Sequence, residues 1–125
     1  MQEIILLFNF KDKSQVEAIK MISYLTQIPV RVIPKEKYTL PLKELVKDEI
    51  PTPEVLNEEE LDGQMIVFAG LLERKLNRFL YLLRDNSQCG KIPYKAVVTR
   101  TNQKWNAFQL LAELKKEHTA MHRKN

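Results

Sequence analysis

The chain has 125 residues, of which 44% are hydrophobic and 29% are charged, and its formal net charge is +4. This length suits one domain with its own core, and no stretch approaches the roughly 18 to 20 consecutive apolar residues of a membrane-spanning helix. No signal-like sequence precedes the first strand-like residues, and the single cysteine, Cys89, has no partner for an internal disulfide. We therefore expect residues 1–125 to form one cytoplasmic domain without contact to a membrane.

The two parts of the chain carry opposite net charges. Residues 1–62 hold 8 Lys and Arg against 12 Asp and Glu, whereas residues 63–125 hold 12 against 4, which gives 8 − 12 = −4 and 12 − 4 = +8. A basic half can attract nucleic acid or an acidic partner. Alternatively, the halves attract each other or are simply solvated, since charge imbalance is a weak signal of function.

The chain opens with a predicted strand and helix. The apolar run Ile4–Phe8 indicates a strand covered on both faces. Ser14, followed three residues later by Glu17, resembles a capping box. Apolar residues then recur at helical spacing, so we expect an amphipathic helix over about 14–27.

Prolines delimit the next elements. Pro29 separates the helix from a second predicted strand at 30–33. Pro41 is expected to begin a short helix. Residues 48–63, rich in Pro and Glu, are expected to connect two halves of the chain.

The second half repeats this order. We expect a strand at 65–70, a helix over about 71–86, a strand at 94–99 and a last helix over about 104–120.

Two segments of the chain resemble each other. Ile-Pro-Val-Arg-Val-Ile at 28–33 returns as Ile-Pro-Tyr-Lys-Ala-Val at 92–97, and each copy follows an apolar run and a helical segment. This internal match predicts two β-α-β-α halves, about 1–50 and 64–121.

The strand compositions predict the order of the sheet. The first and third strands are uninterrupted apolar runs, which suit the centre of a sheet, whereas the second and fourth contain Arg31 and Lys95, which suit its edges. Right-handed crossovers then favour the order 2-1-3-4. The expected fold class is α/β, a small, mostly parallel four-stranded sheet with helices on both faces.

In such a sheet, ligands bind beyond the carboxyl ends of the strands. We expect the loops 9–13, 70–74 and 99–104 to meet there and to form a polar, net basic set able to hold an anion. A helix beginning near Gly70 would add backbone N–H groups. The alternative is that these are the ordinary polar loops of any α/β protein.

Sequence signatures of nucleotide enzymes are missing. The glycines at 63, 70 and 90 form neither a dinucleotide-binding nor a P-loop motif. A phosphate-accepting receiver domain would need carboxylates near Asn9 and Gly70. We therefore expect no cofactor, and we name no reaction, although an enzyme is not excluded.

Nucleophile and metal signatures are equally weak. Cys89 has no histidine near it in sequence, which argues against a catalytic thiol. His118 and His122 are four residues apart and can share one helix face, but no third metal ligand is fixed by the sequence. We expect no catalytic residue and no metal site.

A basic patch in the second half offers weak support for nucleic-acid binding. Tyr94 and Trp105 can stack on bases, although Trp105 can equally cover the edge of the core. The residues of the patch are Arg74, Lys75, Arg78 and Lys95.

The segment 95–105 reads K-A-V-V-T-R-T-N-Q-K-W, and the helix after it contains E-L-K-K-E-H at 113–118. This combination resembles the hallmark of the bacterial DUF3783 family, K-A-[VL]-[VL]-T-x-T-N-x-x-W followed by E-L-x-x-E-H. The resemblance covers about residues 65–118, and Tyr38, Thr39 and Pro41 stand where the first half would carry the hallmark. The family has no assigned activity, so the resemblance implies a bacterial cytoplasmic setting and no reaction.

The hallmark has a structural and a functional interpretation. Thr101 or Asn102 can cap the last helix and Trp105 can cover the end of the sheet. Our leading hypothesis is a non-enzymatic module that binds another protein or a second copy of itself, and the alternative is a small anionic ligand or nucleotide phosphate at the strand ends. The candidate ligand-binding residues are Gly70, Thr99, Arg100, Thr101, Asn102, Lys104 and Trp105.

Overall fold

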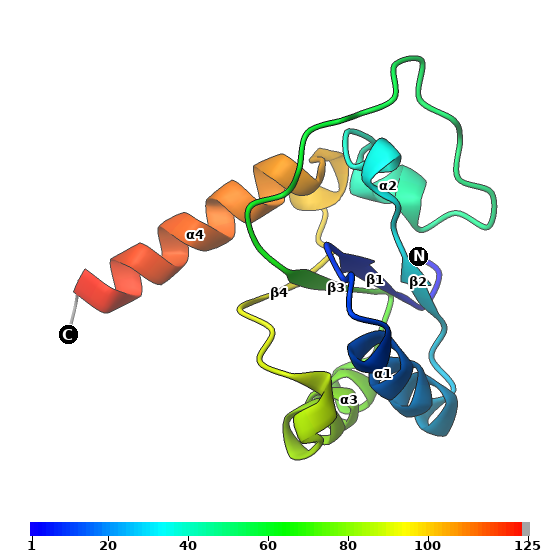
Figure 1. Ribbon diagram of the computed structural model, residues 1–125, viewed down its shortest axis with the longest axis vertical. Coiled ribbons are helices and arrows are strands. Elements are labelled where there is room, and N and C mark those ends of the chain that lie inside the picture. Colours follow the sequence, from blue (N-terminus) through cyan, green and yellow to red (C-terminus); the bar gives the residue numbers. More distant parts are fainter. Residues whose placement is uncertain (124–125) are drawn as a thin grey trace.

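A computed structural model gives the backbone of residues 1–123, with side chains described for residues 1–120. A four-stranded sheet lies between two layers of helices (Figure 1). The elements follow in the order β1 (Ile4–Phe8), α1 (Lys13–Thr26), β2 (Val30–Val32), η1 (Lys35–Lys37), α2 (Leu42–Leu45), β3 (Met65–Ala69), α3 (Glu73–Asp85), η2 (Ser87–Cys89), β4 (Tyr94–Val97), η3 (Asn102–Lys104) and α4 (Ala107–Arg123).

The strand order β2-β1-β3-β4 confirms the predicted arrangement. β1 pairs with β2 and β3 pairs with β4 in parallel, so the sheet is mostly parallel. The central pair, β1 with β3, is antiparallel, with Leu6 opposite Val67. Each half is therefore a β-α-β unit, and the two units run in opposite directions.

This antiparallel pair corrects the expected meeting of three loops at one edge. The loop after β1 lies beside the start of β3, where the Asn9 side-chain amide donates to the carbonyls of Leu61 and Gly63 at 3.0 and 3.3 Å. The loops after β3 and β4 lie at the opposite end of the sheet, because those two strands are parallel. An apolar run indicates a buried strand but carries no information on its direction, so the expectation was wrong for residues 9–13.

Alternate residues of the two central strands enter two core layers. Ile5, Leu7, Ile66 and Phe68 pack against α1 and α3 on one face. The neighbouring residues of β1 and β3 face α2 and the first turns of α4 on the other. Both central strands are buried throughout, which explains their uninterrupted apolar sequences.

The helix starts differ from those expected. Asp12, not Ser14, caps α1, because its carboxylate accepts the backbone N–H of Ser14 at 2.8 Å. The last helix begins at Ala107, where the side chains of Asn106 and Gln109 each accept the other's backbone N–H, at 3.0 and 2.9 Å. Neither Thr101 nor Asn102 caps it.

The two Ile-Pro segments differ by one residue in their strand register. Ile5 pairs with Val30, two residues after Ile28, whereas the equivalent Ile66 pairs with Lys95, three residues after Ile92. A shift of one residue reverses the faces of a strand. Arg31 therefore points to α2, where it donates to the carbonyls of Leu45 and Lys47, and Lys95 lies on the face of α3.

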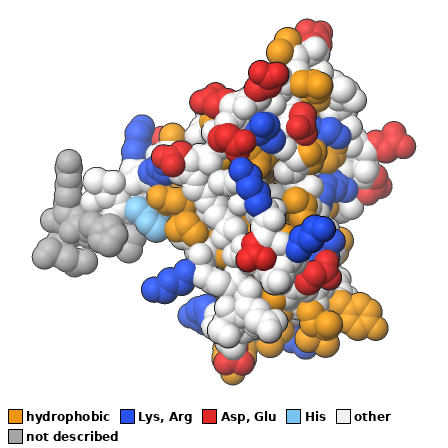
Figure 2. Space-filling view, viewed as in Figure 1, with side chains coloured by type: hydrophobic (Ala, Val, Ile, Leu, Met, Phe, Trp, Pro, Cys, Tyr) orange, Lys and Arg blue, Asp and Glu red, His pale blue; other side chains and the backbone are white. Residues whose placement is uncertain are grey.

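The connection between the halves contains no helix or strand from 46 to 64 and projects from the body (Figure 1). Acidic side chains gather over this part of the molecule (Figure 2). Glu60 holds the connection to the first half through Lys11 and Lys35, and Asp62 binds Lys115 of α4 at 2.8 Å. Within residues 1–123, no helix combines the length and apolarity that crossing a membrane requires.

Candidate functional site

The hallmark segment folds into a closed turn after β4. The backbone N–H of Thr99 donates to the Asn102 side-chain oxygen at 2.8 Å, and the Asn102 N–H donates back to the Thr99 hydroxyl at 3.1 Å. The Asn102 side-chain amide also donates to the Val97 carbonyl at 3.0 Å. Asn102 is only 8% exposed, so its side chain serves the turn.

This amide also covers part of the free edge of β4. The N–H of Val98 donates to Phe68 of β3, so in a parallel ladder the backbone groups of Lys95 and Val97 point away from the sheet. Asn102 binds the Val97 carbonyl and the Thr99 N–H as a neighbouring strand would. The remaining outward groups are the N–H and C=O of Lys95 and the N–H of Val97.

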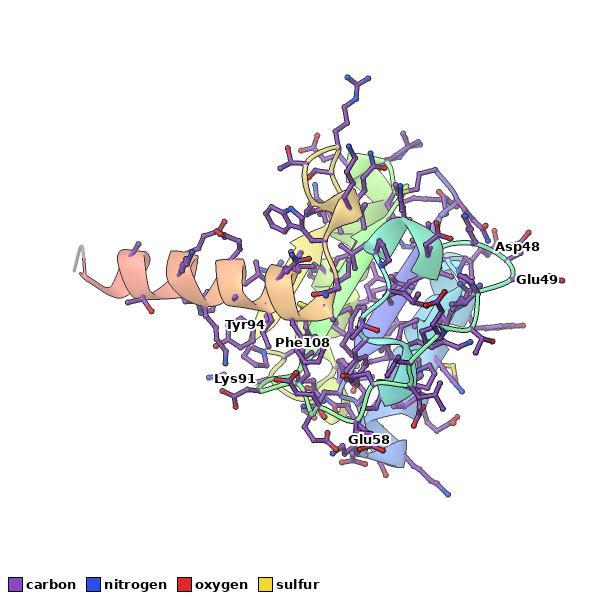
Figure 3. All side chains as sticks on the ribbon, turned by 90° about the horizontal axis from the view of Figure 1, so that it is seen from above. Asp48, Glu49, Glu58, Lys91, Tyr94 and Phe108 are labelled. Carbon is purple, nitrogen blue, oxygen red and sulfur yellow. The ribbon has the colours of Figure 1, made fainter. Side chains whose placement is uncertain are left out.

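A groove of about 420 Å³ runs beside this edge. The groove exists because α4 continues past the edge of the sheet (Figure 1). Tyr94 of β4 contacts this part of α4, since its ring centroid lies 5.0 Å from that of His118. Figure 3 shows Tyr94 and Lys91 on the side from which α4 projects. The lining residues are Lys95, Ala96, Val97, Thr99, Thr101, Asn102, Trp105, Leu110, Glu113, Leu114 and Glu117.

The backbone of Trp105 anchors the start of α4. Its carbonyl accepts the N–H of Leu42 at 2.9 Å, and the N–H of Ala107 donates to Tyr38 at 3.3 Å. These bonds join the hallmark segment to α2 and fix the angle at which α4 leaves the sheet. The groove is therefore a consequence of the fold of both halves.

The charged residues of the groove are mainly acidic. Glu113 forms a surface ion pair with Lys116 at 3.5 Å, and within the described residues Glu117 has no ion pair. Among the described lining residues the only cationic residue is Lys95, and its ammonium lies on the α3 face of β4, where it donates to the Ile92 carbonyl at 2.9 Å. The two carboxylates on the α4 side of the groove do not favour an anionic ligand.

The structure brings together only part of the predicted ligand-binding set. Thr99, Thr101, Asn102 and Trp105 line the groove, together with Lys95 from the predicted basic patch. Gly70, Arg100 and Lys104 do not line it.

Gly70 has a structural role. Its φ is +69°, and a side chain there would begin 2.6 Å from the carbonyl oxygens of Met1 and Gln2. Two carbonyl oxygens at this position, and Glu73 in the first turn of α3, oppose an anion. The predicted anion site gains no support from this arrangement.

The rest of the basic patch lies on α3. Lys75 forms an ion pair with Glu3 at 3.0 Å, whereas Arg74 and Arg78 are exposed. These three residues do not line the groove, so they do not form one surface with the hallmark turn. Nucleic-acid binding by this helix stays a prediction.

The cysteine and histidines do not form a reactive cluster in the described structure. Cys89 is fully buried, and burial raises the pKa of its thiol, which disfavours the nucleophilic thiolate. The side chain of His122 lies outside the described residues. Among the residues that are described, no group of three His, Cys, Asp or Glu side chains is placed to hold a metal ion.

The α4 side of the groove was not among the predicted site residues. Leu110, Glu113, Leu114 and Glu117 follow the i, i+3, i+4, i+7 spacing of one helix face. Three of them belong to the E-L-x-x-E-H part of the hallmark, which was the available signal. The hallmark residues of β4, the turn and α4 thus line one groove.

Comparison with known proteins finds a family model that matches the second half of the chain. No curated protein and no solved structure matches the chain. The family model described as a domain of unknown function, DUF3783, matches residues 64–121, from the residue before β3 into α4. The second half of this chain, which carries β4, the hallmark turn and α4, is therefore similar to the DUF3783 family.

Proposed function

We propose that this protein is a non-enzymatic interaction module that binds an extended segment of another protein. The segment would lie in the groove and pair with β4 as an additional strand. The observation that carries this proposal is the placement of the outward backbone groups of Lys95 and Val97 at a groove whose second wall is α4. Strand addition to a free sheet edge supplies affinity through the backbone and selectivity through the flanking side chains.

The other edge of the sheet supports this role less well. The ladder bonds to β1 use the Pro29 carbonyl and the Ile33 N–H of the second strand segment. Val30 and Val32, which alternate with these residues, therefore also direct their backbone groups outward. However, β2 has three residues, whereas β4 has four and lies beside the groove whose second wall is α4. Within the described residues, β4 is therefore the edge at which free backbone groups border this groove.

Pairing of β4 with a second copy is disfavoured by Lys95 and Asn102. An antiparallel pair centred on Lys95 would place two ammonium groups opposite each other. A pair centred on Ala96 would need the Val97 carbonyl, which already accepts from Asn102. The edge is therefore better suited to a short segment of different sequence.

The experiment is selection of random peptides on the intact protein, followed by binding measurements with two proline variants. Val97→Pro removes an outward N–H of β4, and Val32→Pro removes an outward N–H of β2 as the matched control. We expect the selected peptides to bind wild type and Val32→Pro equally and Val97→Pro at least about fivefold more weakly, since one backbone hydrogen bond contributes about 1 kcal/mol. Circular dichroism would verify that both variants are folded. Peptides that bind Val97→Pro unchanged would contradict strand addition at β4.

A further inference from the structure

We infer that the groove selects segments whose charges alternate, with basic side chains facing α4 and an acidic side chain facing α3. This inference rests on the proposed strand addition at β4. It adds the chemistry of the partner segment, which the free edge alone does not define.

The wall formed by α4 carries the negative charge. Glu113 and Glu117 lie one helical turn apart, outside the apolar residues Leu110 and Leu114. Glu113 is half-buried and Glu117 is exposed, and the ion partner of Glu113 is the surface residue Lys116. A basic side chain entering the groove would meet both carboxylates.

The opposite face of β4 carries the positive charge. A hollow of about 240 Å³ lies there, and its charged lining residues are Arg84, Lys91 and Lys95. Among the described residues none of these three forms an ion pair, and the Lys95 ammonium donates to a backbone carbonyl. Basic side chains border the open corner below α4 in Figure 2. An acidic side chain on this face would therefore find an unpaired cation.

The two walls fit the alternation of a strand. Successive side chains of an added strand would point alternately to α4 and to α3. α4 crosses the direction of β4 where it leaves the sheet (Figure 3), so an added strand would pass under the helix beside Glu113 and Glu117. A segment with the order basic–acidic–basic thus directs its basic groups to the wall that carries the two carboxylates and its acidic group to the face that carries Lys95.

Two synthetic peptides of the same composition test this pattern. One has the order Thr-Val-Lys-Glu-Lys-Val-Thr, and the other has Thr-Val-Lys-Lys-Glu-Val-Thr. The second order forces at least one charged side chain toward a wall of its own sign in either register. We expect fluorescence anisotropy at low ionic strength to give about tenfold tighter binding of the first peptide, with the difference falling as salt is added.

A charge-reversed protein provides the matched test of the α4 wall. Glu113→Lys with Glu117→Lys should abolish the preference for the first peptide. The control, Glu58→Lys with Glu59→Lys in the exposed connection, changes the net charge equally and should preserve it.

The outcomes separate this inference from the proposed function. If both peptides bind wild type equally and both bind Val97→Pro more weakly, the charge pattern is overturned and strand addition stays intact. Selected peptides that bind at β4 and lack alternating charges would also overturn the charge pattern alone. If no peptide depends on Val97, both proposals fail.

Discussion

Replacing Asn102 with alanine removes the side chain that closes the hallmark turn. The variant loses two hydrogen bonds, from Thr99 at 2.8 Å and to Val97 at 3.0 Å. Each such bond contributes roughly 0.5–1.5 kcal/mol, and the backbone groups left behind are near the surface, where water can replace the lost partner. We therefore expect the free energy of unfolding to fall by about 2 kcal/mol.

Urea denaturation followed by circular dichroism measures this change. Thr101→Ala is the matched control, because Thr101 is in the same turn, is exposed and makes no capping hydrogen bond. Its unfolding free energy should change by less than about 0.5 kcal/mol. If Asn102→Ala were as stable as Thr101→Ala, the amide would not hold the turn, and a ligand-binding role for Asn102 would become the better explanation.

Three further predictions concern the stability of the fold. Asn106→Ala and Gln109→Ala should each lower the unfolding free energy by about 1 kcal/mol in urea titrations, because each removes one half of the box that starts α4; no loss in either variant would contradict this role. Gly70→Ala should destabilise more than Gly90→Ala in the same assay: both glycines have positive φ, but a side chain at 70 begins 2.6 Å from two backbone carbonyls, whereas at 90 it meets only the Gln15 side chain at 3.2 Å. Burial raises the pKa of the Cys89 thiol, so the folded state favours the neutral form. The stability that Cys89 contributes is therefore present below the pKa of an unfolded thiol and is lost as the pH rises above it. The unfolding free energy of Cys89→Ala should depend less on pH in alkaline solution than that of wild type, and identical pH profiles would refute this.

The strand order was predictable because the residue types of a strand indicate whether it is buried in the centre of the sheet or lies at an edge. β1 and β3 are apolar at every position and lie in the centre, and Arg31 and Lys95 mark the edges. The direction of β3 relative to β1 was not predictable, since an apolar strand looks the same in either direction. That ambiguity placed Asn9 at the wrong end of the sheet.

The site was only partly predictable from the hallmark. Its turn, Thr99 to Trp105, was identified, but the role of Asn102 depends on bonds to Val97 and Thr99 that sequence does not specify. The capping signal at Asn106 and Gln109 was present in the sequence, and using it would have placed the start of α4 correctly. Glu113 and Glu117 join the groove only because α4 passes the sheet edge.

Hydrogen exchange of backbone amides, read residue by residue by NMR, tests the strand-addition proposal most directly. Adding a selected peptide should slow exchange at Lys95 and Val97, whose amides would donate to the added strand, and should leave Val30 and Val32 unchanged. Protection confined to β2, to α3 or to the connection, with Lys95 and Val97 unaffected, would contradict binding at the edge of β4.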